Sequence, residues 1–98
     1  MPRVRLDPND PDVRTAAFGQ QVQNFMNSDI GQYIEERANA EIMEALAKLR
    51  TVDAADANKI RELQMQVAIP ERILVWMQEA IQQGNQAFQA ILEEAPQT

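Results

Sequence analysis

The side chains that could do chemistry in this sequence are carboxylates, and they lack the partners that most enzyme sites need. The chain contains no Cys and no His, so it cannot form zinc sites with thiolate or imidazole ligands, a His-activated nucleophile or a disulfide. Four glutamates crowd one predicted helix: Glu35, Glu36, Glu41 and Glu44. Without His they do not make the Glu-x-x-His pattern of di-iron proteins, and they point in several directions. We therefore expect no enzyme activity, no metal and no cofactor.

A second set of carboxylates lies near the N-terminus and could suggest a calcium loop. It consists of Asp7, Asn9, Asp10 and Asp12. The segment lacks the Gly and the distal Glu of an EF-hand, and residues 1–12 hold three of the five prolines. Turn chemistry is the preferred interpretation, and we expect an extended N-terminal arm over residues 1–12.

Composition restricts the remaining classes of function. The net charge is −6 and the nine basic residues are scattered, whereas nucleic-acid-binding proteins concentrate Lys and Arg on one face. The three glycines lie too far apart for a phosphate-binding loop. No apolar run approaches the roughly 20 residues that span a bilayer, and the N-terminus lacks a hydrophobic signal segment. We expect a soluble, unexported protein without direct nucleic-acid or membrane binding.

Hydrophobic periodicity predicts an all-α protein with a single helical domain over residues 13–95. The first helix is expected over 11–27, because Asp10 can cap it and Pro11 suits the first helical position.

The second helix is expected over 29–51, with Ser28 or Asp29 as its cap. In the short turn after it, Asp53 is the expected cap of the next helix, and Asp56 takes the position that a capping box gives to an acid. A short turn between helices makes them antiparallel neighbours.

The third and fourth helices are expected over 54–69 and 70–94, with a kink or break within Ile69–Arg72 because Pro70 cannot donate a backbone hydrogen bond. The first two helices together are about as long as the last two. The break between the first two helices and the break at Pro70 should therefore lie at the same level along the hairpin. This predicts a bent antiparallel hairpin of three to four helices. Its predicted hinge residues are Ser28, Asp29, Gly31 and Pro70.

Apolar residues near the proline exceed what one partner helix covers. Residues 69–92 place most of their apolar side chains in an arc of roughly 160°, whereas a core-facing helix usually buries about 100°. The predicted interface residues are Ile69, Ile73, Leu74, Val75, Trp76, Met77 and Ile81. Either the bend of the hairpin closes over this surplus, or a second copy or another protein covers it.

Three positions have two interpretations each. Trp76 is either a core anchor, which we prefer, or an interface hot spot. Gly84 either lets two helices approach closely or is incidental. Arg37 and Glu41 form either a buried pair that fixes the register of a partner or, as we prefer, an ordinary surface pair one turn apart.

The stretches FMNSDIGQYIEERANAEIMEAL, TVDAADANKIRELQ and WMQEAIQQGNQA resemble a group of short predicted proteins encoded by tailed bacteriophages. The matching landmarks are Phe25, Ser28–Gly31, Tyr33, Arg37, Ala38, Val52, Asp53, Asp56, Leu63, Gln64, Trp76, Ala80, Ile81 and Gly84. The similarity covers about residues 18–90. It implies a gene near phage head and packaging genes, and a protein located in the virion or in the cytoplasm of the infected bacterium.

Three hypotheses of function follow, and the third is a small-molecule-binding oligomer that uses the region of Trp76 and Tyr33. In the first, the chain is a non-enzymatic structural or assembly protein of a phage, which forms a homo-oligomer or docks onto another phage protein through its apolar helical face. In the second, it is a small acidic effector that inhibits a host enzyme or defence complex. The second requires a one-sided row of acids, but the acids of this chain are dispersed among Gln and Arg, so we prefer the first.

Overall fold

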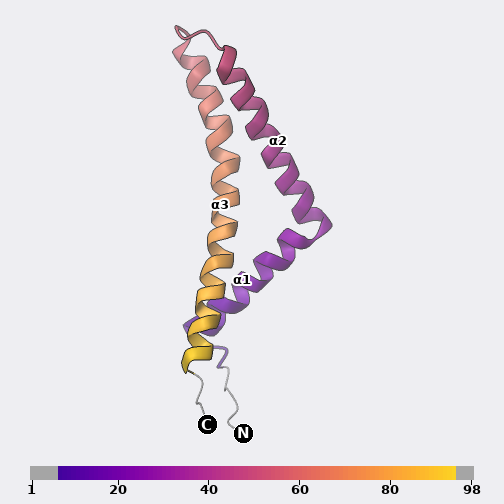
Figure 1. Ribbon diagram of the computed structural model, residues 1–98, viewed down its shortest axis with the longest axis vertical. Coiled ribbons are helices and arrows are strands. Elements are labelled where there is room, and N and C mark those ends of the chain that lie inside the picture. The colour runs from indigo at the N-terminus through magenta and orange to yellow at the C-terminus, as the bar shows by residue number, and fades with distance from the viewer. Residues whose placement is uncertain (1–6, 95–98) are drawn as a thin grey trace. The chain divides into compact units, whose positions relative to one another are not determined.

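The computed structural model describes residues 7–94 and contains three α-helices in that range (Figure 1). They are α1 (Pro11–Asn27), α2 (Asp29–Thr51) and α3 (Ala57–Glu94). Residues 7–94 include no strand, so the all-α prediction is confirmed. Residues 1–6 of the expected arm and Ala95 at the end of the expected domain lie outside the described residues.

The start of α1 matches its sequence signals. The Asp12 backbone N–H donates to Asp10 Oδ1 at 2.8 Å, which caps the helix, and Pro11 occupies its first position. The four residues before Pro11 are not extended as expected, because the Asp10 N–H donates to the Asp7 carbonyl at 2.9 Å and closes a turn.

Ser28 is the cap of α2, and its Oγ accepts a hydrogen bond from the Gly31 N–H at 3.0 Å. Its backbone is extended, with φ −74° and ψ 161°, so one non-helical residue separates α1 from α2. The predicted bounds of both helices agree with the structure.

The start of α3 corrects the prediction. The cap is Asp56, whose Oδ1 accepts from the Lys59 N–H at 3.0 Å, and the helix begins three residues later than expected. Asp53 instead holds the turn, since its carboxylate accepts from Ala55 and its carbonyl accepts from Asp56, each at 2.9 Å. This arrangement uses both aspartates as acceptors, one for the turn and one for the helix.

The expected division of the last helix at Pro70 is wrong, because α3 runs through the proline as one helix of 38 residues. The proline costs ~3 kcal/mol in a helix interior through one lost hydrogen bond and a steric clash. A break would instead leave several backbone groups without partners at two new ends. Residues 66–69, Gln-Val-Ala-Ile, offer no Ser, Thr, Asp or Asn to cap a new helix.

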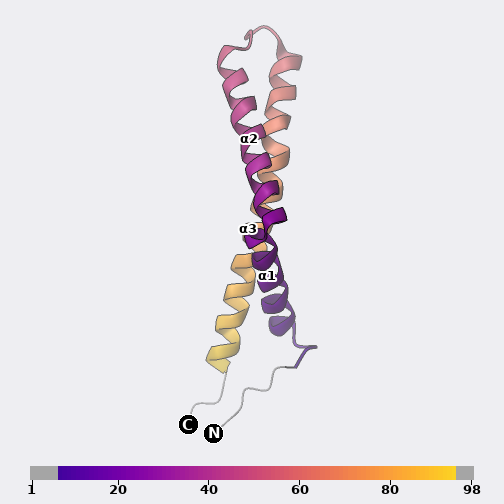
Figure 2. The ribbon, with the colours of Figure 1, turned by 90° about the vertical axis from the view of Figure 1, so that its right-hand side faces the viewer.

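The described part of the chain divides into two compact units, one formed by Met26–Trp76 and the other by residues 7–25 with residues 77–94. In the Met26–Trp76 unit, α2 and the first part of α3 run antiparallel from the turn at residues 52–56 (Figures 1 and 2).

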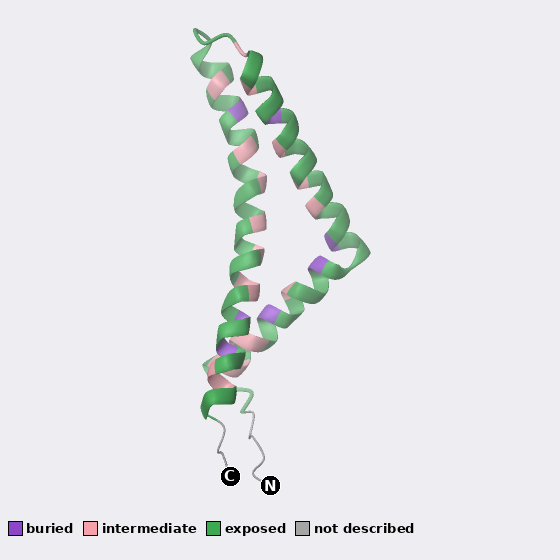
Figure 3. Ribbon diagram, in the orientation of Figure 1, coloured by how far each residue is buried: buried purple, intermediate pink, exposed green. Residues whose placement is uncertain are grey.

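The contact between these two helices is thin and follows one narrow seam. Ala45 is 0% exposed and Leu63 is 1% exposed. Ala45 lies six residues before Thr51 and Leu63 six residues after Ala57, so the two most buried side chains stand at the same level beside the turn. Most other positions of the two helices are exposed or half-buried (Figure 3).

In the other unit, α1 crosses the C-terminal part of α3 at two glycines. A Cβ built on Gly19 would lie 2.7 Å from Gly84 Cα, and one built on Gly84 would lie 2.8 Å from Gly19 Cα. Real Cβ atoms do not approach other atoms this closely, so the crossing requires glycine on both helices. The close-approach interpretation of Gly84 is therefore confirmed, and its partner is Gly19, which the sequence did not single out.

Candidate functional site

The predicted interface lies on the accessible surface of the described chain only in part. Ile69 is 55% exposed, Ile73 40%, Val75 45% and Trp76 59%. The remaining three predicted residues, Leu74, Met77 and Ile81, are half-buried.

The preference for Trp76 as a core residue is wrong, because more than half of its side chain and backbone surface is accessible. The thin core of the unit explains this result. Packing in the Met26–Trp76 unit follows the seam through Ala45 and Leu63, and Trp76 lies on a different side of α3 from Leu63.

The exposed apolar residues of α3 form a second stripe. Met65, Ile69, Ile73 and Trp76 are all at least 40% exposed, and their spacing of four, four and three residues keeps them on one side of the helix. Leu63 lies on the side that faces α2. The first part of α3 is therefore apolar on two sides, while α2 covers only one of them.

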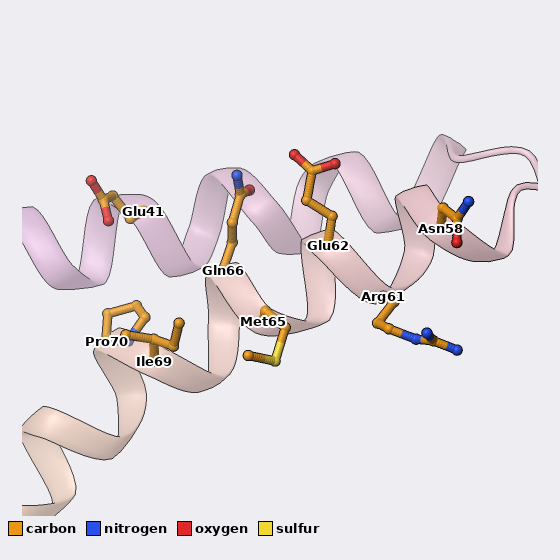
Figure 4. Close-up of a pocket in the computed structure, with 8 residues that line it drawn as sticks. All are labelled: Glu41, Asn58, Arg61, Glu62, Met65, Gln66, Ile69 and Pro70. Atoms are coloured by element: carbon orange, nitrogen blue, oxygen red, sulfur yellow. The ribbon is translucent and has the colours of Figure 1, made fainter.

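A shallow groove of about 570 Å³ runs beside this stripe. On α3 it is lined by Arg61, Glu62, Met65, Gln66 and Ile69, together with Asn58 and Pro70, and on α2 by Glu41. Figure 4 shows Met65, Ile69 and Pro70 close together on α3, with Glu62 and Gln66 extended toward α2. The groove thus joins an apolar stretch of α3 to polar side chains at its border with α2.

The ion pairs near this groove are surface pairs. Arg37 Nε lies 3.3 Å from Glu41 Oε1, with 67% and 51% of the two side chains exposed. Lys48 Nζ lies 3.1 Å from Glu44 Oε1, with side chains 53% and 66% exposed. The surface interpretation of the Arg37–Glu41 pair is confirmed, and each such pair contributes only ~0.2–0.5 kcal/mol to the helix.

The unit formed by α1 and the end of α3 has an apolar groove of its own, of about 470 Å³, beside the Gly19–Gly84 crossing. Phe88 and Ile91 of α3 and Val13, Ala16 and Ala17 of α1 contribute its apolar lining. The described residues that line this groove include no acid or base that could act on a substrate.

The N-terminal carboxylates act as hydrogen-bond acceptors in turns. Asp7 Oδ1 accepts from the Asn9 N–H at 2.9 Å, and Asp10 caps α1, which supports turn chemistry over a calcium loop. Across residues 7–94, no three acidic, His or Cys side chains are grouped so that they could hold a metal ion.

Sequence reasoning missed several exposed apolar residues of the Met26–Trp76 unit. Ile30 is 68% exposed, Tyr33 67% and Met65 53%. Helical periodicity predicts Ile30, Ala38, Ile42 and Ala45 on the inward stripe of α2. The last three are buried or half-buried, whereas Ile30 is not covered. Met65 lies one helical turn before Ile69, so its position on the side of the predicted interface follows from the spacing of four residues.

None of the helices in the described part of the chain combines the length and apolar composition needed to cross a bilayer. No protein-family model, curated protein or solved structure matches the chain. The resemblance to phage proteins therefore stays a prediction, and the exposed surface is the main guide to function.

Proposed function

We propose that this protein is a non-enzymatic assembly protein that associates with itself or with another protein through the exposed apolar side of α3. The observation that supports it is the stripe Met65, Ile69, Ile73 and Trp76, of which every member is at least 40% exposed. Contiguous apolar side chains at a surface mark interaction sites, and burying one such side chain fully contributes ~1.5–3 kcal/mol.

The chemistry of the surface fits a binding role better than a catalytic one. The acids near the stripe, Glu41, Glu44 and Glu62, are each more than half exposed at their side chains. A general acid or base usually lies in a pocket that excludes water and holds its protonation state. These carboxylates instead suit the polar rim of a protein interface.

The resemblance to proteins of tailed bacteriophages suggests the setting of this association. We place the protein in the phage particle, or in the cytoplasm of the infected bacterium while the particle is assembled. Its partner is a second copy or a phage structural protein. The resemblance supports this part of the proposal, and the exposed stripe supports association itself.

Mass analysis of purified phage particles tests the setting. If the protein is structural, its peptides are present at a fixed number of copies per particle, and that number is constant between preparations. Absence from particles, together with capture of a host nuclease or polymerase from infected cells, would replace this proposal with the acidic effector.

A further inference from the structure

We propose that a second copy of this chain packs on one side of the Met26–Trp76 unit, with the two-fold axis parallel to α2 and α3. The inference rests on the proposed function, because it names a second copy as the partner and uses a surface that shares Ile73 with the exposed stripe of α3. We call the surface the pairing face. It is formed by Ile34, Glu41 and Lys48 of α2 and by Glu62, Gln66 and Ile73 of α3.

The structure shows that these sides of α2 and α3 adjoin each other. Glu41 lines one groove together with Glu62 and Gln66, and Glu41 and Gln66 line another with Lys48. Residues seven positions apart lie on nearly the same side of a helix, so Ile34 shares the side of Glu41, as Ile73 shares the side of Gln66.

The pairing face changes character along its length. Toward Ser28 it is apolar, with Ile34 37% exposed and Ile73 40% exposed. Toward the turn at residues 52–56 it is charged, with the side chains of Lys48 and Glu62 53% and 60% exposed. A partner must therefore be apolar at one end and carry charges of both signs at the other.

A second copy related by a two-fold axis parallel to the helices meets this requirement. Such an axis places α2 beside α3 of the second copy, antiparallel and at the same level, as in an antiparallel four-helix bundle. Thr51 and Ala57 are the ends of α2 and α3 that lie next to the turn. The length of helix from Ile34 to Thr51 is nearly the same as the length from Ala57 to Ile73. Ile34 therefore stands opposite Ile73 of the second copy.

The same register matches the polar end. Lys48 lies three residues before Thr51 and Glu62 five residues after Ala57, so a base stands opposite an acid across the two-fold. Glu41 and Gln66 stand opposite each other by the same count. Opposite charges at matched levels fix the register of helices that pack together.

A two-fold axis perpendicular to the helices gives the opposite result. It lays the apolar end of one copy on the charged end of the other, so that Ile34 and Ile73 cover Lys48 and Glu62. Covering these charged side chains with aliphatic groups removes water from them without adding an opposite charge, which carries a desolvation cost, so this geometry is disfavoured.

The balance of charge near the face also favours self-association. The bases in this region are Arg37, Lys48, Lys59 and Arg61, and the acids are Glu41, Glu44 and Glu62. The whole chain carries −6, so acids elsewhere repel a second copy. A surface whose charges nearly balance is the place where two such chains can approach with little of that repulsion.

Sedimentation equilibrium of the full chain tests the inference, with Ile34→Glu and Ile73→Glu as the disrupting variants. Because the charges introduced fall at the apolar end, each variant is expected to raise the dimer dissociation constant by at least about tenfold. Met43→Glu is the matched control. Met43 is on α2 and 66% exposed, but it lies on another side of the helix, so its dissociation constant should match that of the original chain.

Exchange of charges tests the register independently of folding. Lys48→Glu places like charges opposite each other and weakens association, as does Glu62→Lys. The double variant restores the attraction with the signs reversed and recovers most of the lost affinity. If the double variant instead loses as much binding free energy as the two single variants lose together, the register is overturned.

A single thiol tests the direction of the axis. The chain has no Cys, and Ala55→Cys places one in the exposed turn. A parallel axis brings the two turns together, so mild oxidation links the copies into a covalent dimer. Dimers that do not link at this position overturn the parallel axis.

The failures of this inference and of the proposed function are distinguishable. A chain that is monomeric at all concentrations, yet present at fixed copy number in phage particles, overturns the pairing face and keeps the assembly function. A dimer that is disrupted by Met43→Glu and not by Ile34→Glu overturns the pairing face alone. Absence from particles leaves the dimer intact and removes the structural setting.

Discussion

At the scale of single residues, glycine contributes the best-defined contact in the molecule. A Cβ on Gly84 would meet Gly19 Cα at 2.8 Å and the Thr15 carbonyl oxygen at 3.3 Å. Both atoms belong to the backbone of α1, which cannot move aside as the end of a flexible side chain does. The two helices must separate to admit even one methyl group.

Gly84→Ala is therefore expected to destabilise the protein. Helix propensity alone favours alanine by ~1 kcal/mol, but the overlap with backbone atoms outweighs that gain, and we expect a net loss on the order of 1–3 kcal/mol. Denaturant unfolding followed by circular dichroism measures it. Gln86→Ala, at an exposed position one turn or less away, should change stability by less than about 0.5 kcal/mol. A more stable Gly84→Ala variant would contradict the close crossing.

Trp76 offers a direct report on association because it is the chain's only tryptophan. It is 59% exposed in the isolated chain, so its fluorescence emission should be that of a hydrated indole at low protein concentration. Ile73 belongs both to the exposed stripe that contains Trp76 and to the pairing face, so a second copy on that face lies beside Trp76. We therefore expect the emission maximum to move to shorter wavelength as concentration rises. The Ile34→Glu variant is the control, and its emission should not move. Constant emission across a range in which sedimentation shows association would place Trp76 outside the interface.

At the scale of elements, each of the two units buries only a narrow side of its helices. In the Met26–Trp76 unit the buried positions include Gly31 and Ala45 on α2 and Leu63 on α3. In the other unit Gly19 is buried on α1. Ser28, the one residue between α1 and α2, is extended and caps α2, so each helix has an end of its own.

A helix end could be predicted from the sequence where it contained a single candidate for the capping residue or two adjacent candidates. The bounds of α1 and α2 were predictable because Asp10 and Ser28 are each followed at once by apolar periodicity. The start of α3 was ambiguous, since Asp53 and Asp56 can both cap, and only the hydrogen bonds of the folded turn choose between them. Exposure of Trp76 was not predictable, because periodicity measures the width of an apolar stripe and not how much of it a neighbour covers.

The expectation of a break at Pro70 considered only the free-energy cost of a proline inside a helix. It left out the cost of the two new helix ends that a break would create. Pro70 lies within the stripe of α3 that faces α2 and is half-buried. The length of helix from Ala57 to Pro70 equals the length from Ala38 to Thr51. The proline ring on α3 is therefore at the same level as Ala38 on α2, which has a small side chain. An alanine at that level leaves room for the proline ring and for the displaced backbone beside it.

Replacing the proline tests this account of α3. Pro70→Ala restores the missing N–H donor in the helix interior, and we expect a stabilisation on the order of 1–3 kcal/mol. The midpoint of urea unfolding measures it, with Gln64→Ala at an exposed position of the same helix as a control for propensity. A loss of stability in Pro70→Ala would mean that the proline ring contributes more through packing than its backbone costs.

At the scale of the whole molecule, the buried core is small for a chain of this length. Among the described residues, the buried apolar side chains are Met26, Ala45, Leu63 and Ala87. Four such residues, two of them alanines, supply little of the hydrophobic free energy that offsets chain entropy in folding. The exposed stripe of α3 is a further source of burial that only a partner can realise, so stability and association should be linked.

This linkage predicts a melting temperature that depends on protein concentration. If the folded form is a dimer, mass action favours it by RT ln 10, about 1.4 kcal/mol, for each tenfold rise in concentration. For two chains of about 100 residues that unfold together, the melting temperature should rise on the order of 3 °C per tenfold increase. Thermal unfolding followed by circular dichroism at several concentrations measures it. Ile34→Glu should flatten the dependence while Met43→Glu preserves it, and a melting temperature of the original chain that does not change with concentration would contradict a stabilising dimer.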